Sequence, residues 1–176
     1  PGMLRTDNIE LATVMDPVGS AEIAAEFGVP RACTTVEELL DDPTLQAVYI
    51  ASPVAMHLEQ IKACAAAGKH VLCEKPIALN AADAARMAEE ADKAGVRHMT
   101  AFTYRFAPSM RYVKHLVSSG ALGTPRHFRS QRFLDWPETS WGWRQIKKLA
   151  GAGDLFDMTI HRIDFSQDLL GPIKSI

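Results

Sequence analysis

Hydrophobic and polar residues alternate along the chain in two different patterns. Short runs rich in β-branched and apolar residues predict strands at residues 9–15, 47–51, 70–73 and 96–102. Segments in which apolar residues recur every three or four positions predict helices at residues 21–27, 36–40, 55–67 and 81–94. The run at 47–51 is apolar throughout, as in a strand covered on both faces of a parallel sheet. Strands and helices that alternate in this way predict repeated βαβ units.

Capping residues mark where several of these helices begin and end. Ser20 and Asn80 can each cap a helix N-terminus, and Thr35 with Glu38 has the spacing of a capping box. Glycine follows three of the helices, at positions 28, 68 and 95, where it can adopt the left-handed conformation that ends a helix.

The pattern changes after residue 102. Pro108 takes a favourable first-turn position for a helix over 109–119. The basic stretch 125–134 predicts a strand that begins a second, antiparallel layer, and residues 135–150 read as a loop with a short helix. A further helix is predicted over 154–170. We therefore expect a first domain of residues 1–104 and the start of a second, α+β domain at residues 105–176.

The glycine-rich G-x-G-x-x-G turn of a dinucleotide-binding fold is absent from the sequence. It would follow a strand that precedes Ile9, and the chain has no such strand. Residue 1 is Pro, and the sequence predicts the start of another strand after Gly171-Pro172. We expect the chain to be an internal piece of a longer protein.

Composition narrows the classes of protein to consider. Of the 176 residues, 47% are hydrophobic and 23% charged, which is typical of a soluble globular protein. A net charge of −2 gives no electrostatic reason to expect a nucleic acid or an anionic membrane as partner. The three cysteines, at positions 33, 64 and 73, form no C-x-x-C and argue against a disulfide framework or a thiolate metal site. Reduced thiols and the lack of a signal peptide indicate the cytoplasm.

Polar side chains follow four successive predicted strands, where a parallel α/β sheet binds its ligands. They are Asp16 after the first strand, Ser52-Pro53 with His57 after the second, Glu74-Lys75-Pro76 after the third, and Tyr104-Arg105 after the fourth.

Two of these groups have both a chemical and a plain structural interpretation. The Asp16 carboxylate can accept hydrogen bonds from the hydroxyls of an adenosine ribose and would repel a 2′-phosphate, or it can simply cap a turn. Lys75 can stabilise an alkoxide or polarise a carbonyl, with Pro76 permitting a cis peptide bond, or it can be a surface lysine in a turn.

The helix predicted over 154–170 carries the remaining acid–base candidates. Asp157 and His161 are four positions apart and so share a face, with Asp154 and Asp164 near it. Histidine is the usual general acid or base near neutral pH. An amphipathic helix capped by Asp154 is the plain alternative. A zinc site lacks a third ligand at a familiar spacing, so no metal is expected.

An aromatic and basic patch precedes this helix. It consists of Trp136, Trp141, Trp143 and Arg144. Sugars stack on aromatic faces and are held by arginine, although a tryptophan in the core or at an interface is the commoner case.

Several of these residues together resemble a known family, the Gfo/Idh/MocA oxidoreductases, named after glucose–fructose oxidoreductase, inositol dehydrogenase and rhizopine catabolism. The matching motifs are Ala51-Ser52-Pro53 with His57, GKHVLCEKP over 68–76, Tyr104-Arg105-Phe106-x-Pro108, Trp143-Arg144, and Gly151-x-Gly153 followed by Asp157, His161 and Asp164. They occur in order through nearly the whole chain, which makes the set far more specific than any one member.

The resemblance implies a fold and a reaction. The fold is a Rossmann-type doubly wound parallel sheet, lacking its first strand and glycine loop here, followed by the start of a domain with a mostly antiparallel sheet. The reaction transfers a hydride between a secondary hydroxyl of a sugar or cyclitol and the nicotinamide of NAD, with NADP less favoured. A homo-oligomer is implied for the intact protein, with neither nucleic acid nor membrane as partner.

The resemblance also implies roles for individual residues. Lys75 would be the catalytic lysine, His161 the proton-transfer residue and Asp157 its substrate-binding neighbour. The cofactor would lie against Asp16, Ser52, Pro53, His57, Glu74, Pro76 and Arg105. The substrate would contact Trp143 and Arg144 together with Lys75, Asp157 and His161.

Phe156 and Ala152 depart from the family's usual pattern, which puts the identity of the substrate in doubt more than the chemistry. Two other functions remain open. One is a glycosidase-like elimination in which a tightly held NAD oxidises the substrate only transiently. The other is a dinucleotide-sensing protein without catalysis.

Overall fold

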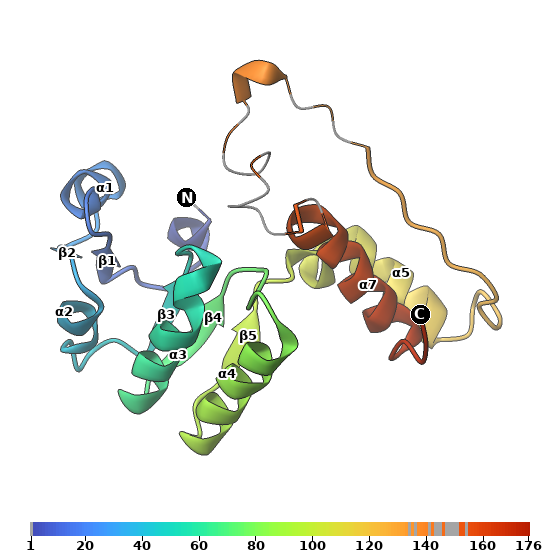
Figure 1. Ribbon diagram of the computed structural model, residues 1–176, viewed down its shortest axis with the longest axis horizontal. Helices are drawn as coiled ribbons and strands as arrows, with labels where there is room; N and C mark the ends of the chain where they lie inside the picture. The colour runs from blue at the N-terminus through green and yellow to red at the C-terminus, as the bar shows by residue number, and fades with distance from the viewer. Residues whose placement is uncertain are drawn as a thin grey trace. The chain divides into compact units, whose positions relative to one another are not determined.

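The computed structural model describes residues 2–133, 135, 137–140, 142, 146, 152–153 and 155–176 (Figure 1). The chain forms two compact units. The first consists of Pro1–Cys73 and Asn80–Met99, and the second of Glu74–Leu79 and Thr100–Ile176. The predicted boundary between residues 104 and 105 remains a prediction.

The first unit follows the predicted alternation of strands and helices. Its elements are η1 (Met3–Arg5), β1 (Thr13–Met15), α1 (Ser20–Phe27), β2 (Arg31–Cys33), α2 (Val36–Leu40), β3 (Ala47–Ile50), η2 (Val54–Met56), α3 (His57–Ala66), β4 (His70–Cys73), α4 (Ala81–Lys93) and β5 (His98–Thr100), whose last residue belongs to the second unit. The strand β2 was not predicted, because Arg31-Ala32-Cys33 is too short to show a period of two and buries only its last residue.

The strands of the first unit form two parallel groups. β1 pairs with β2, from Thr13↔Arg31 to Met15↔Cys33, and β3 pairs with β4, from Ala47↔His70 to Ile50↔Cys73, with β5 next to β4. A doubly wound sheet has the strand order 3-2-1-4-5-6, so its first strand lies between the second and the fourth. No strand of the described residues takes that place. The predicted parallel α/β fold is therefore confirmed.

Two of the predicted helix caps are present. The Thr35 hydroxyl accepts a hydrogen bond from Glu38 N at 3.2 Å, and the Glu38 carboxylate accepts one from Thr34 N at 2.9 Å. Asn80 Oδ1 accepts from Asp83 N at 2.9 Å at the start of α4.

The prediction that Ser20 caps the next helix was wrong. Ser20 is the first residue of α1 and is buried, and the cap position is Gly19, which makes no side-chain cap. The carboxylate of Asp16 acts here instead, because Oδ1 accepts hydrogen bonds from Val18 N at 2.9 Å and Gly19 N at 2.8 Å. These donors belong to the turn that precedes the helix, so Asp16 orders this turn as an Asx turn.

Small side chains allow α3 and α4 to pack closely (Figure 1). Ala65 of α3, Ala91 of α4 and Val96 form a buried apolar cluster. All three cysteines are free and buried, and burial raises the pKa of the Cys64 thiol to about 11. No disulfide joins these cysteines in the part of the chain that the structure describes.

A buried lysine closes the loop between α2 and β3. Lys69 is only 8% exposed, and its ammonium donates to the carbonyl oxygens of Asp42 at 2.9 Å and Leu45 at 2.8 Å. A charged donor of this kind satisfies backbone acceptors that no strand or helix pairs.

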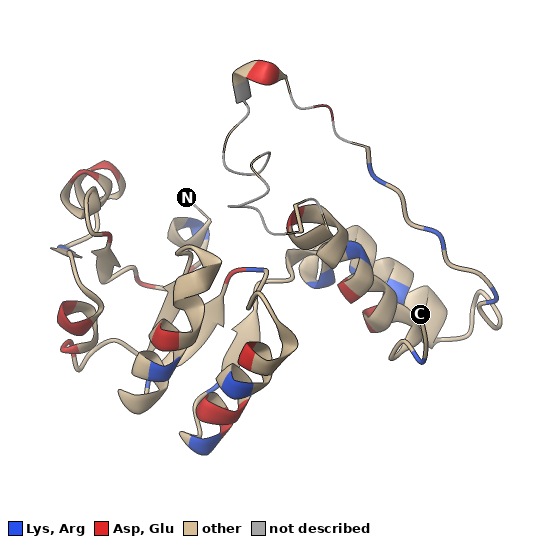
Figure 2. Cartoon of the chain, viewed as in Figure 1, with Lys and Arg blue, Asp and Glu red and all other residues tan. Residues whose placement is uncertain are grey.

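The second unit contains η3 (Thr103–Phe106), α5 (Pro108–Ser118), η4 (Glu138–Ser140), the π-helix η6 (Leu155–Thr159) and α7 (Ile160–Leu170). Pro108 is the first residue of α5, as predicted. The helix predicted over 154–170 is divided into a π-helical turn and an α-helix. Charged residues of both signs occur on α3, α4 and α7, whereas the charged residues of α1 and α2 are all acidic and the Arg and Lys residues of α5 have no acidic neighbour on that helix (Figure 2).

The prediction of a strand over 125–134 is wrong for the residues that the structure describes. Residues 125–133 are extended and exposed but belong to no strand. A single extended segment is not stable as a strand until it pairs with a neighbour, and none of the described residues pairs with this one. The three tryptophans at 136, 141 and 143 lie outside the described residues.

Replacing Lys69 by Met should lower the free energy of unfolding by about 2 kcal/mol, because it keeps the apolar stem but leaves two half-buried carbonyls unpaired. Urea denaturation of both variants measures this. Lys62→Met is the matched control, since Lys62 is exposed on α3 and pairs only with Glu59, and it should cost less than about 0.5 kcal/mol. Equal losses in the two variants would contradict the role of Lys69.

Candidate active site

The candidate active site lies within the second unit and begins with Lys75. The Lys75–Pro76 peptide bond is cis, as the sequence permits. The backbone N–H of Lys75 donates to Glu74 Oε2 at 3.1 Å. The two side chains that flank the lysine, Glu74 and Pro76, are half-buried in the same turn.

Lys75 contacts Asp157, a residue 82 positions further along the chain. Its Nζ donates to Asp157 Oδ1 at 2.8 Å and to the Asp157 carbonyl oxygen at 2.7 Å. The two side chains are 17% and 16% exposed. Two charge-assisted hydrogen bonds to one residue hold the ammonium in a defined position while part of it remains open to solvent.

His161 stands one turn after Asp157, as the spacing predicted. Asp157 lies in the π-helix η6 and His161 in the first turn of α7. Single π-helical turns inserted into α-helices occur often at functional sites.

The surroundings of His161 favour its neutral form. Its side chain is buried, with the residue only 7% exposed. Burial lowers the pKa of His161 below 6.5, the positive charges of Lys75 and Arg162 lower it further, and the carboxylates of Glu74 and Asp157 oppose them. A neutral imidazole at pH 7 can accept a proton from a substrate hydroxyl.

Aromatic side chains surround the imidazole. The ring of Tyr104 stacks on His161 with centroids 4.9 Å apart and planes 21° apart, and Phe102 meets it edge-on at 6.1 Å and 83°. The Arg162 guanidinium lies over the Tyr104 ring, 5.0 Å from its centroid, and Arg132 donates to the Tyr104 hydroxyl at 2.7 Å. The sequence indicated Tyr104 as a residue beyond a strand and as part of a family motif, but it gave no sign of these partners.

Arg105, predicted to contact the cofactor, pairs with two carboxylates of α7. Its Nε and Nη2 donate to Asp164 at 2.9 and 2.5 Å, and Nη1 lies 3.6 Å from Asp168, which also receives a hydrogen bond from Lys114. The hydrogen bonds and charge of Asp164 raise the pKa of Arg105. These contacts fix η3 and α5 to α7. A nicotinamide contact of Arg105 remains a prediction.

The predicted cofactor residues of the first unit lie in two turns after strands. After β3, the His57 ring nitrogen Nε2 lies 3.0 Å from the Ser52 carbonyl oxygen, and the Ser52 hydroxyl donates to Gln60 Oε1. Pro53 is the cap position of η2. After β1, the two backbone hydrogen bonds to Asp16 lower the pKa of its carboxyl, so it carries a charge at neutral pH.

Two predicted substrate residues, Trp143 and Arg144, lie outside the described residues, as does Asp154. Phe156 is half-buried in η6. Among the described residues, no group of three or more histidine, cysteine or acidic side chains is arranged to hold a metal ion. No described helix is both long and apolar enough to cross a membrane.

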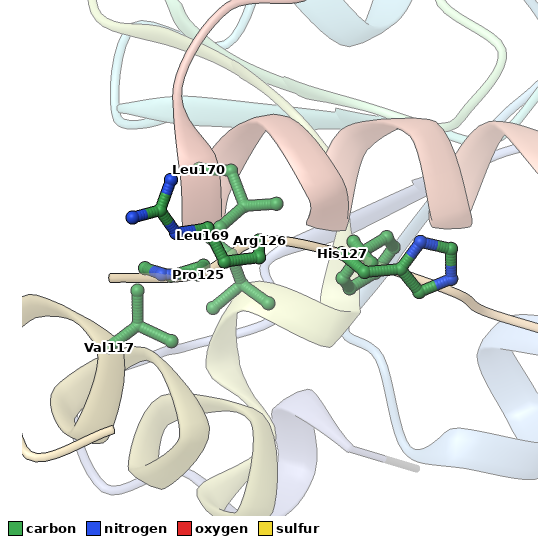
Figure 3. A pocket seen from close by; sticks show the side chains of 7 residues that line it. Val117, Pro125, Arg126, His127, Leu169 and Leu170 are labelled. Atoms are coloured by element: carbon green, nitrogen blue, oxygen red, sulfur yellow. The ribbon is translucent and has the colours of Figure 1, made fainter. Parts of the chain in front are cut away.

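One pocket of about 350 Å³ lies in the second unit, and its lining residues differ from those of the Lys75, Asp157 and His161 cluster. Val117 of α5, residues 125–128 and the end of α7 at Leu169 and Leu170 line it (Figure 3). It contains none of the predicted site residues.

The first unit has the fold of a dinucleotide-binding domain. A Rossmann-type parallel sheet carries an ionised aspartate after β1, and a lysine, a carboxylate and a neutral histidine gather in the second unit. Two family models match the chain, an oxidoreductase family with an NAD-binding Rossmann fold over residues 1–102 and the Gfo/Idh/MocA C-terminal domain over residues 110–176. The chain belongs to the Gfo/Idh/MocA oxidoreductase family.

Individual relatives agree with this membership. The levoglucosan dehydrogenase of Pseudarthrobacter phenanthrenivorans is 34% identical over 164 residues, 92% of this chain and 42% of its own. The myo-inositol 2-dehydrogenase of Thermotoga maritima is 36% identical over 151 residues, 85% of this chain and 43% of its own. A solved structure of levoglucosan dehydrogenase in complex with NADH and levoglucosan superposes with a TM-score of 0.77 at 32% identity, covering 91% of this chain and 44% of that one. The chain spans about half the length of the curated relatives it matches.

Replacing Arg105 by Met should lower the free energy of unfolding by about 2 kcal/mol, because the buried carboxylate of Asp164 loses its partner. The expected loss is smaller than for a fully buried pair, since the Arg105 side chain is 43% exposed. Thermal and urea unfolding measure it. Arg86→Met on α4 removes an exposed pair and is the control, with an expected change below about 0.5 kcal/mol. A loss no larger than the control's would show that the ion pair does not hold α7.

Proposed function

We propose that the protein is an NAD-dependent dehydrogenase that oxidises a secondary hydroxyl of a sugar or cyclitol, or carries out the reverse reduction. The observation that carries the proposal is the cluster of Lys75, Asp157 and His161. The names of the relatives, a levoglucosan and a myo-inositol dehydrogenase, support a polyhydroxylated substrate.

The first unit offers groups that fit a dinucleotide. The ionised carboxylate of Asp16 stands at the end of β1, where the ribose hydroxyls of a bound dinucleotide would reach it. Ser52, Pro53 and His57 belong to the turn and helix start after β3, so they follow the carboxyl end of a parallel strand as Asp16 does. We assign these residues to the cofactor, together with Glu74 and Pro76.

The residues of the second unit supply the acid–base chemistry. When bound next to the substrate, NAD would supply the acceptor for the hydride of the carbinol carbon. His161 takes the hydroxyl proton onto its neutral imidazole, so the C–O single bond becomes a carbonyl. The Lys75 ammonium donates a hydrogen bond to the same oxygen and stabilises the negative charge that develops on it. Asp157 positions Lys75 through the two hydrogen bonds described above.

Screening sugars and cyclitols for net NADH formation by the whole protein tests this function. Stoichiometric NADH with a ketone product is expected. An elimination with transient oxidation returns the hydride to the substrate and gives product without net NADH, and a dinucleotide sensor gives no product. Either result would overturn the proposal.

Replacing Lys75 by Met in the whole protein should lower kcat by about 10²–10³-fold while leaving the dissociation constant for NAD unchanged, because the ammonium acts mainly in the transition state. Steady-state kinetics and calorimetric titration measure the two quantities. The control is Lys93→Met, which removes an exposed lysine of α4 paired with Glu89. A Lys75 variant with wild-type turnover would refute the catalytic assignment.

Replacing Asp16 by Asn should reduce the preference for NAD over NADP at least tenfold. The amide oxygen can still accept the hydrogen bonds from Val18 and Gly19, so the turn is kept while the charge that repels a 2′-phosphate is lost. The ratio of kcat/KM for the two cofactors is the measurement. Asp42→Asn, at an acidic residue in the turn after α2, should leave the ratio unchanged. A wild-type protein that prefers NADP would contradict the role of Asp16.

A further inference from the structure

The imidazole of His161 lacks the hydrogen bond that commonly orients a catalytic histidine. Such a residue usually donates its second ring N–H to a carboxylate or a carbonyl, which fixes the plane of the ring and the tautomer. Here Nδ1 of His161 is buried and has no hydrogen-bond partner among the described residues. Something else must hold the ring in place.

The contacts that remain are aromatic. Tyr104 covers a face of the imidazole at 4.9 Å between centroids, and Phe102 meets it edge-on. Both residues belong to the segment at the end of β5 and the start of η3, so they come from the same short stretch of chain. Offset stacked and edge-on pairs are the favoured arrangements of such rings, and they restrict rotation of both partners.

Tyr104 is itself held by two cations. The guanidinium of Arg162 lies over its ring at 5.0 Å, and Arg132 donates to its hydroxyl at 2.7 Å. Burial raises the pKa of the Tyr104 hydroxyl, but hydrogen bonds and charges from Arg162 and Arg132 outweigh burial and lower it. Two consecutive residues of α7, His161 and Arg162, therefore contact one tyrosine ring.

We infer that Tyr104 is the positioning residue of His161, and that its ring does the orienting work that a hydrogen-bonded carboxylate does in other sites. The inference deepens the proposed function and rests on it for its catalytic consequence. Tyr104 touches neither of the other members of the cluster in any described contact, so it acts through His161.

The inference has a spectroscopic consequence that does not require activity. A stacked tyrosine shifts the ring-proton resonances of His161 upfield, and the shift disappears when the aromatic ring is removed. Tyr104→Phe keeps the ring and loses the hydroxyl with its hydrogen bonds to Arg132 and Arg162, whereas Tyr104→Leu removes the ring.

The same variants change the titration of the imidazole. The charged groups that face His161 are Glu74, Lys75, Asp157 and Arg162, and none of them is altered by either substitution. Loss of the ring in Tyr104→Leu admits water to the imidazole and so weakens the burial that lowers its pKa. We expect the titration midpoint of His161 to rise toward 6.5 in Tyr104→Leu and to stay at its lower value in Tyr104→Phe.

Heteronuclear NMR of the histidine rings in the whole protein tests both points. The His161 signal is identified by its loss in His161→Asn, and the exposed His98, paired with Asp92, is the internal control. The expected result is an upfield-shifted His161 signal in the wild type and in Tyr104→Phe, with the shift lost in Tyr104→Leu. A wild-type His161 without the upfield shift overturns the inference even if Tyr104→Leu fails to fold. An unchanged His161 titration in a folded Tyr104→Leu also overturns it.

Kinetics then separates positioning from a general structural role. In Tyr104→Leu, kcat should fall about 10- to 100-fold with the KM for NAD unchanged. Tyr104→Phe, which keeps the ring, should retain the wild-type kcat. Since the reaction needs the neutral imidazole, activity is lost as pH falls through the pKa of His161, and this loss should move to higher pH in Tyr104→Leu.

In a His161→Asn background, Tyr104→Leu should have no further effect on kcat. An equal effect in both backgrounds contradicts the inference, whereas a wild type inactive on every sugar and cyclitol contradicts only the proposed function.

Discussion

The contact between Lys75 and Asp157 is the constraint on which the candidate site depends. It joins the turn after β4 to the beginning of the helical segment that carries His161, across 82 residues of sequence. Both the carboxylate and the carbonyl oxygen of Asp157 accept from the ammonium, so the lysine is tied to the backbone of η6 and not only to a side chain that could rotate. Without this contact, Lys75 would lose the hydrogen bonds that tie it to the helical segment of Asp157 and His161.

The local structure of the first unit could be predicted because each signal in it is short-range. The strand at His70–Cys73 and the cap at Asn80 depend on residues within a few positions of one another, and both are confirmed. Ser20 shows the limit of such signals, because it is the first residue of the helix, and the Asp16 carboxylate instead accepts hydrogen bonds from Val18 and Gly19 in the turn before it. The strand β2 is too short to have a detectable period.

The site could be predicted only in part, because motifs identify residues but not their partners. Lys75, Asp157 and His161 follow from motif spacing, and the structure brings them into one cluster. The pairing of Arg105 with Asp164 and the stacking of Tyr104 on His161 depend on how η3 packs against α7, which no local pattern in the sequence encodes. The strand prediction for residues 125–133 fails because a strand is stable only when it pairs with a neighbouring strand, and the described residues provide none.

The state of the cysteines has a practical consequence for work on this protein. All three thiols of the sequence are buried, and burial raises the pKa of both Cys33 and Cys64. Thiolate is the form that reacts with maleimides and similar reagents, so the native thiols of the folded chain react slowly. A single cysteine introduced on an exposed part of α4 would therefore accept a fluorophore or spin label selectively, without the removal of any natural cysteine.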